Sequence, residues 1–388
     1  MAATSFPSQS EVDRVYDVCI IGAGPAGATA ARLLPRNLRV LLVDKRPLDR
    51  AYASGDPQKL CGGLLSPRAQ AELARQGLGV PQSVLAGPQL FAVRTCDIDA
   101  GLERLYQRFY TNIDREAFDR WLVSLVPDSV EVAHGWRALS LERDDEASIV
   151  RFATPGGGRA SVAARVVIGA DGAGSLVRRA LLGDTRRVPA YVAMQARCVT
   201  AGGEPHYGAI FDAAATDFYG WTIPKGAEVL VGAALPAGPD AHRRFDEFVA
   251  RAREAGFDFG LEYERAAAPV VRPARPSHIT LGRRDVLLAG EAAGHISPSS
   301  AEGISYALRS GAAVASALAH GVEGAAERYS IAAWPLTSEV CAKLAKSSLI
   351  ASATTRRVAL RTGIGALRTP VTEPTTTYGA RSGGLQAW

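Results

Sequence analysis

The sequence has 388 residues, of which 47% are hydrophobic and 21% charged, and its net charge is +5. At roughly 150 residues per domain there is room for two or three domains, and the composition excludes disordered and fibrous proteins. Basic residues are scattered, which argues against nucleic-acid binding, and five widely spaced cysteines match neither a disulfide framework nor a metal site.

The N-terminal region predicts a β-α-β unit. An apolar strand at residues 15–21 leads into Gly22-Ala23-Gly24-Pro25-Ala26-Gly27, a helix follows to residue 34, and a second strand at 40–43 ends at Asp44. In such a motif the first glycine permits a tight turn, the second lets the backbone approach a pyrophosphate, and the third allows close helix packing. Asp44 is then placed to accept hydrogen bonds from ribose hydroxyls.

The next segments alternate between helices and strands. We expect a glycine-bearing loop around residues 59–63, a helix at 68–76, irregular strand at 91–110, and a helix at 113–126 capped by Asp114. Two paired strands, at 148–153 and 160–168, are joined by a turn at 155–158, and the second runs into Gly-Ala-Asp-Gly at 169–172.

The C-terminal half begins with a different pattern. Residues 190–234 alternate as strands with a turn at Lys225-Gly226, and a helix follows at 242–255. This stretch predicts a separate, substrate-side sheet. A buried strand at 285–288, the sequence Ala-Gly-Glu-Ala-Ala-Gly and a helix at 304–320 follow, and the segment from residue 369 onward reads as poorly ordered.

Two segments resemble signatures of FAD enzymes with the p-hydroxybenzoate hydroxylase fold: VVIGADGAGSLVRR at 166–179 and DVLLAGEAAGHISPSSAEG at 285–303. Residues 112–122 also resemble the helix whose arginine contacts FAD in that family. The family usually has Asp where this chain has Glu291. With the glycine motif, the resemblance implies FAD contacts from Gly22, Gly24, Ala26, Gly27, Asp44, Lys45, Cys61, Gly62, Gly63, Arg115, Asp171, Gly172, Gly290, Glu291, Pro298, Gly303 and Ile304.

Two further segments resemble the geranylgeranyl reductase family. Lys59-Leu60-Cys61-Gly62-Gly63 is similar to its Cys-Gly-Gly loop, and Tyr219 to Pro224 with Gly232 is similar to its YxWxFP…GxG signature. Ile223 and Ala234 depart from that pattern. The resemblance makes Cys61, Tyr219 and Trp221 candidate catalytic residues, although alternating aromatics on a strand and a small thiol are equally typical of packing.

The resemblance implies an α/β fold in which a Rossmann-like FAD-binding domain is interleaved with a mainly antiparallel substrate sheet. We assign residues 1–83, 111–185 and 278–330 to the FAD-binding domain and residues 84–110 and 186–277 to the substrate domain. Residues 331–370 are expected to form C-terminal helices, and residues 371–388 a disordered tail.

The predicted function is an FAD-dependent oxidoreductase that reduces a C=C bond of an apolar, isoprenoid or polyketide-like substrate. Reduced flavin would supply hydride, and Cys61, Tyr219 or a bound water the proton. An FAD-dependent monooxygenase and a non-redox flavin-binding scaffold are alternatives. Among monooxygenases a halogenase is disfavoured against a hydroxylase, because none of the five lysines lies in a matching segment.

The sequence also bears on partners and location. No second dinucleotide motif is present, so NAD(P)H would dock transiently or a separate electron donor would replace it. No signal peptide or membrane-spanning stretch is recognisable, so we expect a cytoplasmic protein, with peripheral membrane contact left open. His295, just past the third FAD signature, is expected to be an exposed cap or a donor to phosphate.

Overall fold

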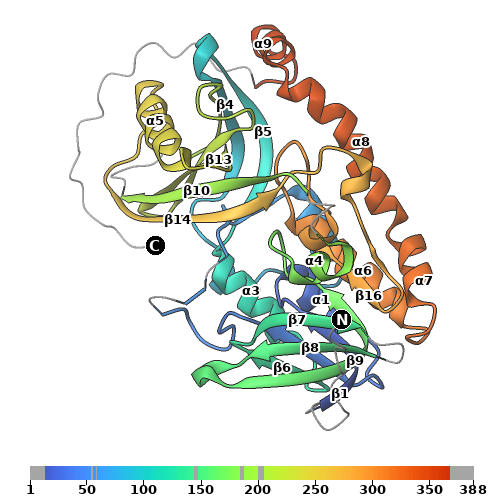
Figure 1. Ribbon diagram of the computed structural model, residues 1–388. Coiled ribbons are helices and arrows are strands. Elements are labelled where there is room, and N and C mark those ends of the chain that lie inside the picture. Colours follow the sequence, from blue (N-terminus) through green and yellow to red (C-terminus); the bar gives the residue numbers. More distant parts are fainter. Residues whose placement is uncertain are drawn as a thin grey trace, which may run out of the picture.

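The computed structural model describes residues 14–53, 56–57, 59–143, 147–183, 188–199 and 205–367. The chain forms two eight-stranded sheets, one at the bottom and one at the upper left of Figure 1, with helices packed on both. Among the described residues no helix is long and apolar enough to cross a membrane.

The first sheet is built on a parallel core in the order β16-β9-β1-β2-β6. Its strands are β1 (Arg14–Ile21), β2 (Val40–Asp44), β6 (Val130–His134), β7 (Arg137–Arg143), β8 (Ser148–Ala153), β9 (Arg159–Gly169), β15 (Gly282–Arg283) and β16 (Val286–Leu288). The continuous apolar runs in β1 and β2 suit this core, because parallel strands are covered on both faces. β8 pairs antiparallel with β9 and extends the sheet through β7.

Helices cover one face of this sheet, namely α1 (Pro25–Leu33), α2 (Pro67–Arg75), α3 (Arg115–Ser124), α6 (Ile304–Leu318) and α7 (Ala325–Ala332). The opposite face packs against α4 (Leu176–Leu182) and the β7–β8 hairpin. α1 and α6 cross closely at Gly311, where a Cβ atom would lie 2.3 Å from the carbonyl oxygen of Ala26. Glycine at this position therefore sets how closely the two helices approach.

The second sheet has the order β14-β10-β13-β12-β11-β4-β5-β3 and is mainly antiparallel. Its strands are β3 (Leu64–Leu65), β4 (Leu90–Asp97), β5 (Leu102–Asn112), β10 (Ala190–Val199), β11 (Tyr207–Phe211), β12 (Gly220–Lys225), β13 (Glu228–Pro236) and β14 (Glu262–Val271). α5 (Ala241–Glu254) packs Phe245 and Phe248 into one core of this sheet. A separate cluster contains Leu90, Ile223 and Leu230.

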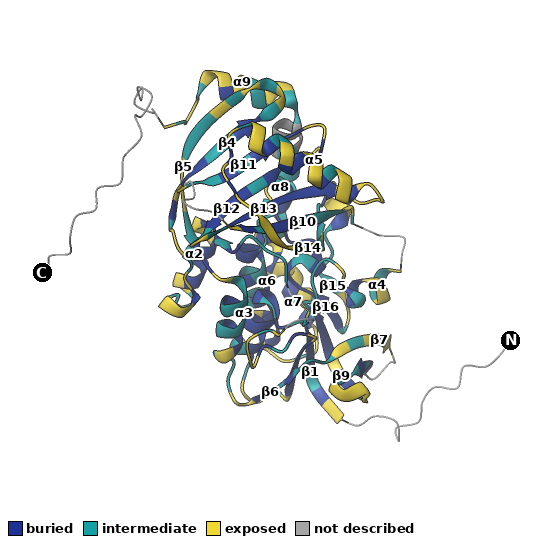
Figure 2. Cartoon of the chain, turned by 90° about the vertical axis from the view of Figure 1, so that its left-hand side faces the viewer, coloured by how far each residue is buried: buried dark blue, intermediate teal, exposed yellow. Residues whose placement is uncertain are grey.

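Two C-terminal helices, α8 (Trp334–Ala351) and α9 (Ala353–Thr362), run along one flank from the first sheet to the second (Figure 1). At the lower end Glu339 of α8 accepts hydrogen bonds from Tyr306 and Arg309. At the upper end Arg356 of α9 pairs with the buried Asp97. Figure 2 shows buried residues concentrated in both sheets, with exposed residues on outer helices such as α4 and α9.

The predicted fold class is confirmed: a Rossmann-type first sheet interleaved in sequence with a mainly antiparallel second sheet, and C-terminal helices. One local expectation is wrong, because residues 91–110 form not an irregular strand but the hairpin β4–β5. The hairpin turns at Gly101, whose φ is 59°. The predicted domain boundaries stay predictions, and the predicted tail lies outside the described residues.

Candidate functional site

The glycine turn after β1 has two kinds of glycine. A Cβ atom on Gly22, whose φ is +104°, would lie 2.4 Å from the carbonyl oxygen of Ala170, and one on Gly27 would lie 1.8 Å from that of Gly22. Gly24 differs, since the nearest atom to its Cβ position is a guanidinium nitrogen of Arg46 at 3.8 Å. Gly22 and Gly27 are thus required by packing, whereas Gly24 borders open space.

The first turn of α1 is available to an anion. No side chain caps its N-terminus, and the aligned N–H groups of a helix N-terminus attract negative charge. Ala26 is buried in this turn, while Lys45, at the end of β2, is exposed.

Asp44 is already hydrogen-bonded on both carboxylate oxygens. It accepts a 2.7 Å hydrogen bond from the backbone N–H of Ala23, and the backbone and guanidinium of Arg46 donate three more. A ribose hydroxyl that approached Asp44 would therefore share or replace a bond to Arg46. The ribose role of Asp44 stays a prediction.

Arg46 and Arg115 converge on one buried carboxylate. Asp119 of α3, which is fully buried, accepts from Arg46 Nη1 at 2.5 Å and from Arg115 Nε at 2.9 Å. Burial by itself would raise the pKa of Asp119, but the two guanidinium groups hold it below its usual value. Sequence reasoning anticipated Arg115 here and missed Arg46 and Asp119, although Asp119 follows Arg115 by one helical turn.

Asp171 and Gly172, at the end of β9, have different surroundings. The Asp171 carboxylate accepts from Ser175 Oγ and from the backbone N–H groups of Leu176 and Val177, so it caps α4. Gly172, with φ +75°, borders open space, since the nearest atoms to its Cβ position are Glu291 Oε2 at 3.9 Å and Lys59 Nζ at 4.0 Å.

Glu291 connects the two sheets. Its Oε2 atom lies 3.2 Å from Lys59 Nζ, and its Oε1 atom accepts a 3.1 Å hydrogen bond from the backbone N–H of Val271 on β14. The other predicted residues of the segment 285–303, and Ile304 after it, each make separate contacts. Gly290 packs against Ala26, the carbonyl of Pro298 accepts from Arg272, and Gly303 precedes α6, whose first residue Ile304 is buried.

The Cys-Gly-Gly loop packs against β12. A Cβ atom on Gly62 would lie 2.4 Å from Ile223 Cδ1, and one on Gly63, whose φ is +61°, would lie 2.3 Å from the carbonyl oxygen of Ile113. The N–H of Gly63 donates to Cys61 Sγ at 3.4 Å. Burial disfavours the Cys61 thiolate, yet Arg115, this N–H and Lys59 hold the pKa of Cys61 below its usual value.

Tyr219 and Trp221 lie side by side, with ring centroids 6.0 Å apart. The Tyr219 hydroxyl donates to the carbonyl of Ser300 at 2.6 Å, in the loop before α6. Burial raises the pKa of Tyr219 to about 12, so the phenol stays protonated at neutral pH. The Trp221 indole N–H donates to Gln195 Oε1 at 3.3 Å, and the ring covers Gly232.

His295 contradicts its expected exposure. Its side chain is fully buried, Nε2 lies 3.2 Å from Thr337 Oγ1 of α8, and Nδ1 has no hydrogen-bond partner in the described part of the chain. Burial, with a smaller effect of Arg309, lowers the pKa of His295 to about 3. The sequence could not show this because α8, which covers His295, is about 40 residues further along the chain.

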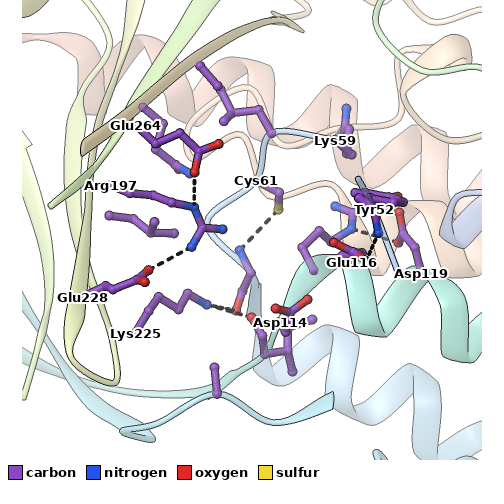
Figure 3. Close-up of a pocket in the computed structure, with 18 of the residues that line it drawn as sticks. Tyr52, Lys59, Cys61, Asp114, Glu116, Asp119, Arg197, Lys225, Glu228 and Glu264 are labelled. Atoms are coloured by element: carbon purple, nitrogen blue, oxygen red, sulfur yellow. Dashed lines mark hydrogen bonds and ion pairs between the residues drawn. The ribbon is translucent and has the colours of Figure 1, made fainter. Parts of the chain in front are cut away.

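A cavity of about 330 Å³ lies between the Cys-Gly-Gly loop, α3 and one end of the second sheet (Figure 3). Its lining is highly charged. On the sheet wall Arg197 pairs with Glu228 at 2.9 Å and Glu264 at 3.3 Å, beside Lys225. Sequence reasoning missed these four residues. The available signal was that Lys225 directly follows Pro224 of the singled-out motif.

The arrangement fits FAD. Gly24 and Gly172 leave open space next to an uncapped helix N-terminus, and Arg46, Arg115 and Lys59 supply positive charge for phosphates. The hydroxyl of Tyr52, which lines the cavity, is buried without a hydrogen-bond partner among the described residues, so it could bond to a ligand. No cluster of three His, Cys, Asp or Glu side chains that could hold a metal ion occurs in the described ranges.

Comparisons with known proteins agree with this geometry. The FAD binding domain family matches residues 15–195. Protein CbrA from Escherichia coli O6:H1 is 39% identical over 349 residues, which are 90% of this chain and 94% of that protein. CbrA from Shigella sonnei is 39% identical over the same length, which is 97% of that protein.

One solved structure shares the fold at a TM-score of 0.74. It is a geranylgeranyl bacteriochlorophyll reductase-like protein from Thermoplasma acidophilum, 21% identical, and the match covers 89% of this chain and 90% of that one. PqsL from Pseudomonas aeruginosa in complex with 2-aminobenzoylacetate matches at a TM-score of 0.63 and 19% identity, over 90% of this chain and 99% of that one. At these identities the likeness shows the fold.

Proposed function

The chain belongs to the family of the CbrA proteins and is an FAD-dependent oxidoreductase, and on this premise we propose that it reduces a C=C bond of a largely apolar substrate. When bound and reduced, FAD supplies the hydride. The protein itself binds the cofactor, excludes water and places a proton donor. The residues proposed to hold the cofactor are those around Gly24, Gly172, Arg115 and the Cys-Gly-Gly loop.

One observation carries the proposal: the two segments that resemble geranylgeranyl reductases lie against each other. Gly62 of the loop packs on Ile223 of β12, so closely that a Cβ atom on Gly62 would clash with Ile223 Cδ1. These residues are 161 positions apart in the sequence. Such convergence is expected if the segments form one reaction site and has no other evident reason in the sequence.

Apolar and aromatic side chains border this junction. Leu90, Ile223 and Leu230 are buried there, and Leu64, Tyr110, Tyr207 and Trp221 pack against them. The partly buried members of this cluster, Leu64, Tyr110, Tyr207 and Trp221, keep some accessible apolar surface, and burying it under an apolar chain would favour binding. The cavity beside Cys61 is lined by Leu60, Ile113 and Leu230 as well as by charged side chains, so we place the polar end of the substrate there.

Two side chains at the junction can move a proton. The Tyr219 hydroxyl is held by the carbonyl of Ser300 and stays protonated at neutral pH, and we propose it as the donor to the substrate carbon. Cys61, whose pKa is lowered, is the weaker choice for a donor that must carry its proton. Trp221 would orient the substrate through its ring.

A specific feature favours a second candidate, an FAD-dependent hydroxylase. The cavity lining of Gln195, Arg197 and Glu228 would bind a polar substrate better than an apolar chain. In that case oxygen would be a substrate and the aromatic cluster would serve mainly as core.

Reoxidation kinetics separate these candidates. The purified protein would be photoreduced without oxygen and then mixed either with polyprenyl alkenes or with air, while the flavin absorbance is followed. Alkene-dependent reoxidation with a saturated product, and slow reoxidation by air, support the reductase. Rapid reoxidation by air with a hydroxylated product would replace it with the hydroxylase, and a protein that gains no FAD on reconstitution contradicts both.

The electron donor would be found in the same assay. We propose that NAD(P)H docks transiently, because the dinucleotide motif at residues 22–27 is taken by FAD in this proposal. Reduction of the flavin by NADH or NADPH supports transient docking, whereas reduction only by a reduced ferredoxin supports a separate protein donor. A flavin that undergoes no substrate-dependent redox change would favour a non-redox scaffold.

A further inference from the structure

Lys225 is bonded to the backbone beneath the Cys-Gly-Gly loop. It ends β12, and its Nζ atom donates to the carbonyl oxygens of Gly63 at 3.1 Å and Ile113 at 2.7 Å and to Asn112 Oδ1. Three oxygens saturate the three donors of an ammonium group. Because the carbonyls belong to the loop and to the residues that enter α3, Lys225 fixes the substrate sheet to both.

Asn112 and Ile113, which contact Lys225, are themselves held by hydrogen bonds. Asn112 Nδ2 donates to the carbonyl of Pro224 at 2.8 Å and to that of Pro88 at 2.9 Å. The N–H of Ile113 donates to the carbonyl of Gly63 at 2.9 Å, next to the Lys225 bond. The end of β12, the end of β5 and the loop therefore meet at one buried point.

The Gly63 residue links Lys225 to Cys61. Its carbonyl accepts from Lys225, and its N–H donates to Cys61 Sγ at 3.4 Å. Only glycine suits this position, because φ is +61° and a Cβ atom would lie 2.7 Å from Lys225 Nζ. Figure 3 shows Lys225 and Cys61 approaching from opposite sides, the first from the sheet and the second from the loop.

The charges around this point favour an anion at Cys61. Arg115 of α3 and Lys59 of the loop face the thiol, and both lower its pKa. Lys225 is faced by Cys61, by Asp114 at the start of α3 and by Arg197 on β10. None of the three hydrogen bonds of Lys225 is to a carboxylate, so its charge is left to act on the loop.

We infer that Lys225 is a positioning residue: its ammonium holds the Gly63 carbonyl so that the Gly63 N–H stays directed at Cys61 Sγ, where it and the surrounding cations stabilise negative charge on the sulfur. The inference rests on the proposed function only in placing this loop beside the cofactor. Lys225 itself need not contact cofactor or substrate. Its effect is measured as a change in the ionisation of the Cys61 thiol.

The test is the pH dependence of Cys61 alkylation by iodoacetamide in the purified full chain, quantified by mass spectrometry of the Cys61 peptide. Lys225→Met should raise the alkylation midpoint by about one pH unit and, at any pH below the wild-type midpoint, slow alkylation about tenfold, as expected when the Gly63 N–H is released and a neighbouring charge partly screened by water is removed. Lys225→Arg, which keeps the charge and donates to carbonyls, should restore most of the wild-type profile.

Three comparisons make the result decisive. The partly buried Cys341 on α8 is the internal reference, and its midpoint should not move. Arg243→Met removes a positive charge from the exposed side of α5 and should leave the Cys61 profile unchanged. If Lys225→Met does not fold, as judged by circular dichroism, Lys225→Gln should show an upward shift as well, because its shorter, uncharged side chain has two donors and cannot bond Gly63, Ile113 and Asn112 together.

A wild-type midpoint in a folded, neutral Lys225 variant overturns the inference. The thiol measurement requires no substrate, so its outcome is independent of the reductase assay. A shifted midpoint without alkene reduction would overturn the proposed function alone, and alkene reduction with an unshifted midpoint would overturn the role of Lys225 alone.

Discussion

The glycine turn after β1 and the sheet wall of the cavity depend on different kinds of contact. In the turn, Gly27 packs on Gly22, and Asp44 bonds to Arg46 two residues away. At the sheet wall, Lys225 bonds to Gly63 and Ile113, which are 162 and 112 residues away. The contacts within the turn join residues close in the sequence, although Gly22 also packs against Ala170 after β9, whereas the sheet wall forms only when the two sheets have met. Mutations in the two regions should therefore affect folding, cofactor content and activity in different ways.

The largest effect should come from Gly27→Ala. Its Cβ would lie 1.8 Å from the Gly22 carbonyl oxygen, a clash with backbone that cannot be relieved by a rotamer change, so we expect little folded protein. Gly24→Ala is the matched variant, because its Cβ meets open space. It should fold but lose most bound FAD, measured as flavin absorbance per protein. Normal flavin content in Gly24→Ala would contradict the phosphate approach proposed here.

The next effect concerns the buried carboxylate between Arg46 and Arg115. Asp119→Asn leaves two buried guanidinium groups without their charge partner and should lower the free energy of unfolding by about 3 kcal/mol in urea titrations. Because the pKa of Asp119 is lowered on folding, its contribution is present above pH ~3.9, the unfolded value, and is lost as pH falls through the folded pKa. Glu247→Gln, which breaks an exposed pair with Arg243, should leave the free energy of unfolding almost unchanged. Equal losses would contradict this account.

Tyr219→Phe tests whether the hydroxyl next to β12 donates the proton. If the hydroxyl is the proton donor, kcat for alkene reduction should fall about 100-fold while flavin content and KM change little. The control is Tyr191→Phe at the start of β10, where the hydroxyl bonds to Asp217. It should leave kcat near the wild-type value. A Tyr219→Phe enzyme of full activity would remove Tyr219 from the chemistry.

The smallest effect is expected for Arg197→Gln. Its partners Glu228 and Glu264 are substantially exposed, so stability should change by less than about 1 kcal/mol. If the protein reduces apolar chains, the kcat/KM of Arg197→Gln for such a substrate should fall less than threefold. A loss of 100-fold or more with polar substrates would instead show that the charged wall binds the substrate, which is the arrangement expected of the hydroxylase.

Much of the cofactor half was predictable from the sequence because its signals are local. Strand-to-helix periodicity, the packing of Gly27 on Gly22 and the Asp114 cap of α3 each depend on residues within a few positions of one another. The resemblance to FAD enzymes added the order of the motifs. Even so, it did not show that Asp171 caps α4 or that Glu291 reaches across to Val271.

The tertiary structure alone decided which side chains meet between the sheets. Lys225 lies under the Cys-Gly-Gly loop, Arg197 lies between two glutamates on neighbouring strands, and His295 is sealed by α8. These contacts depend on strand register and on the docking of helices far away in sequence, and local periodicity carries no information about either. The sequence by itself therefore determined the fold class and the glycine turn, whereas the charges around the cavity were decided by how the two sheets pack.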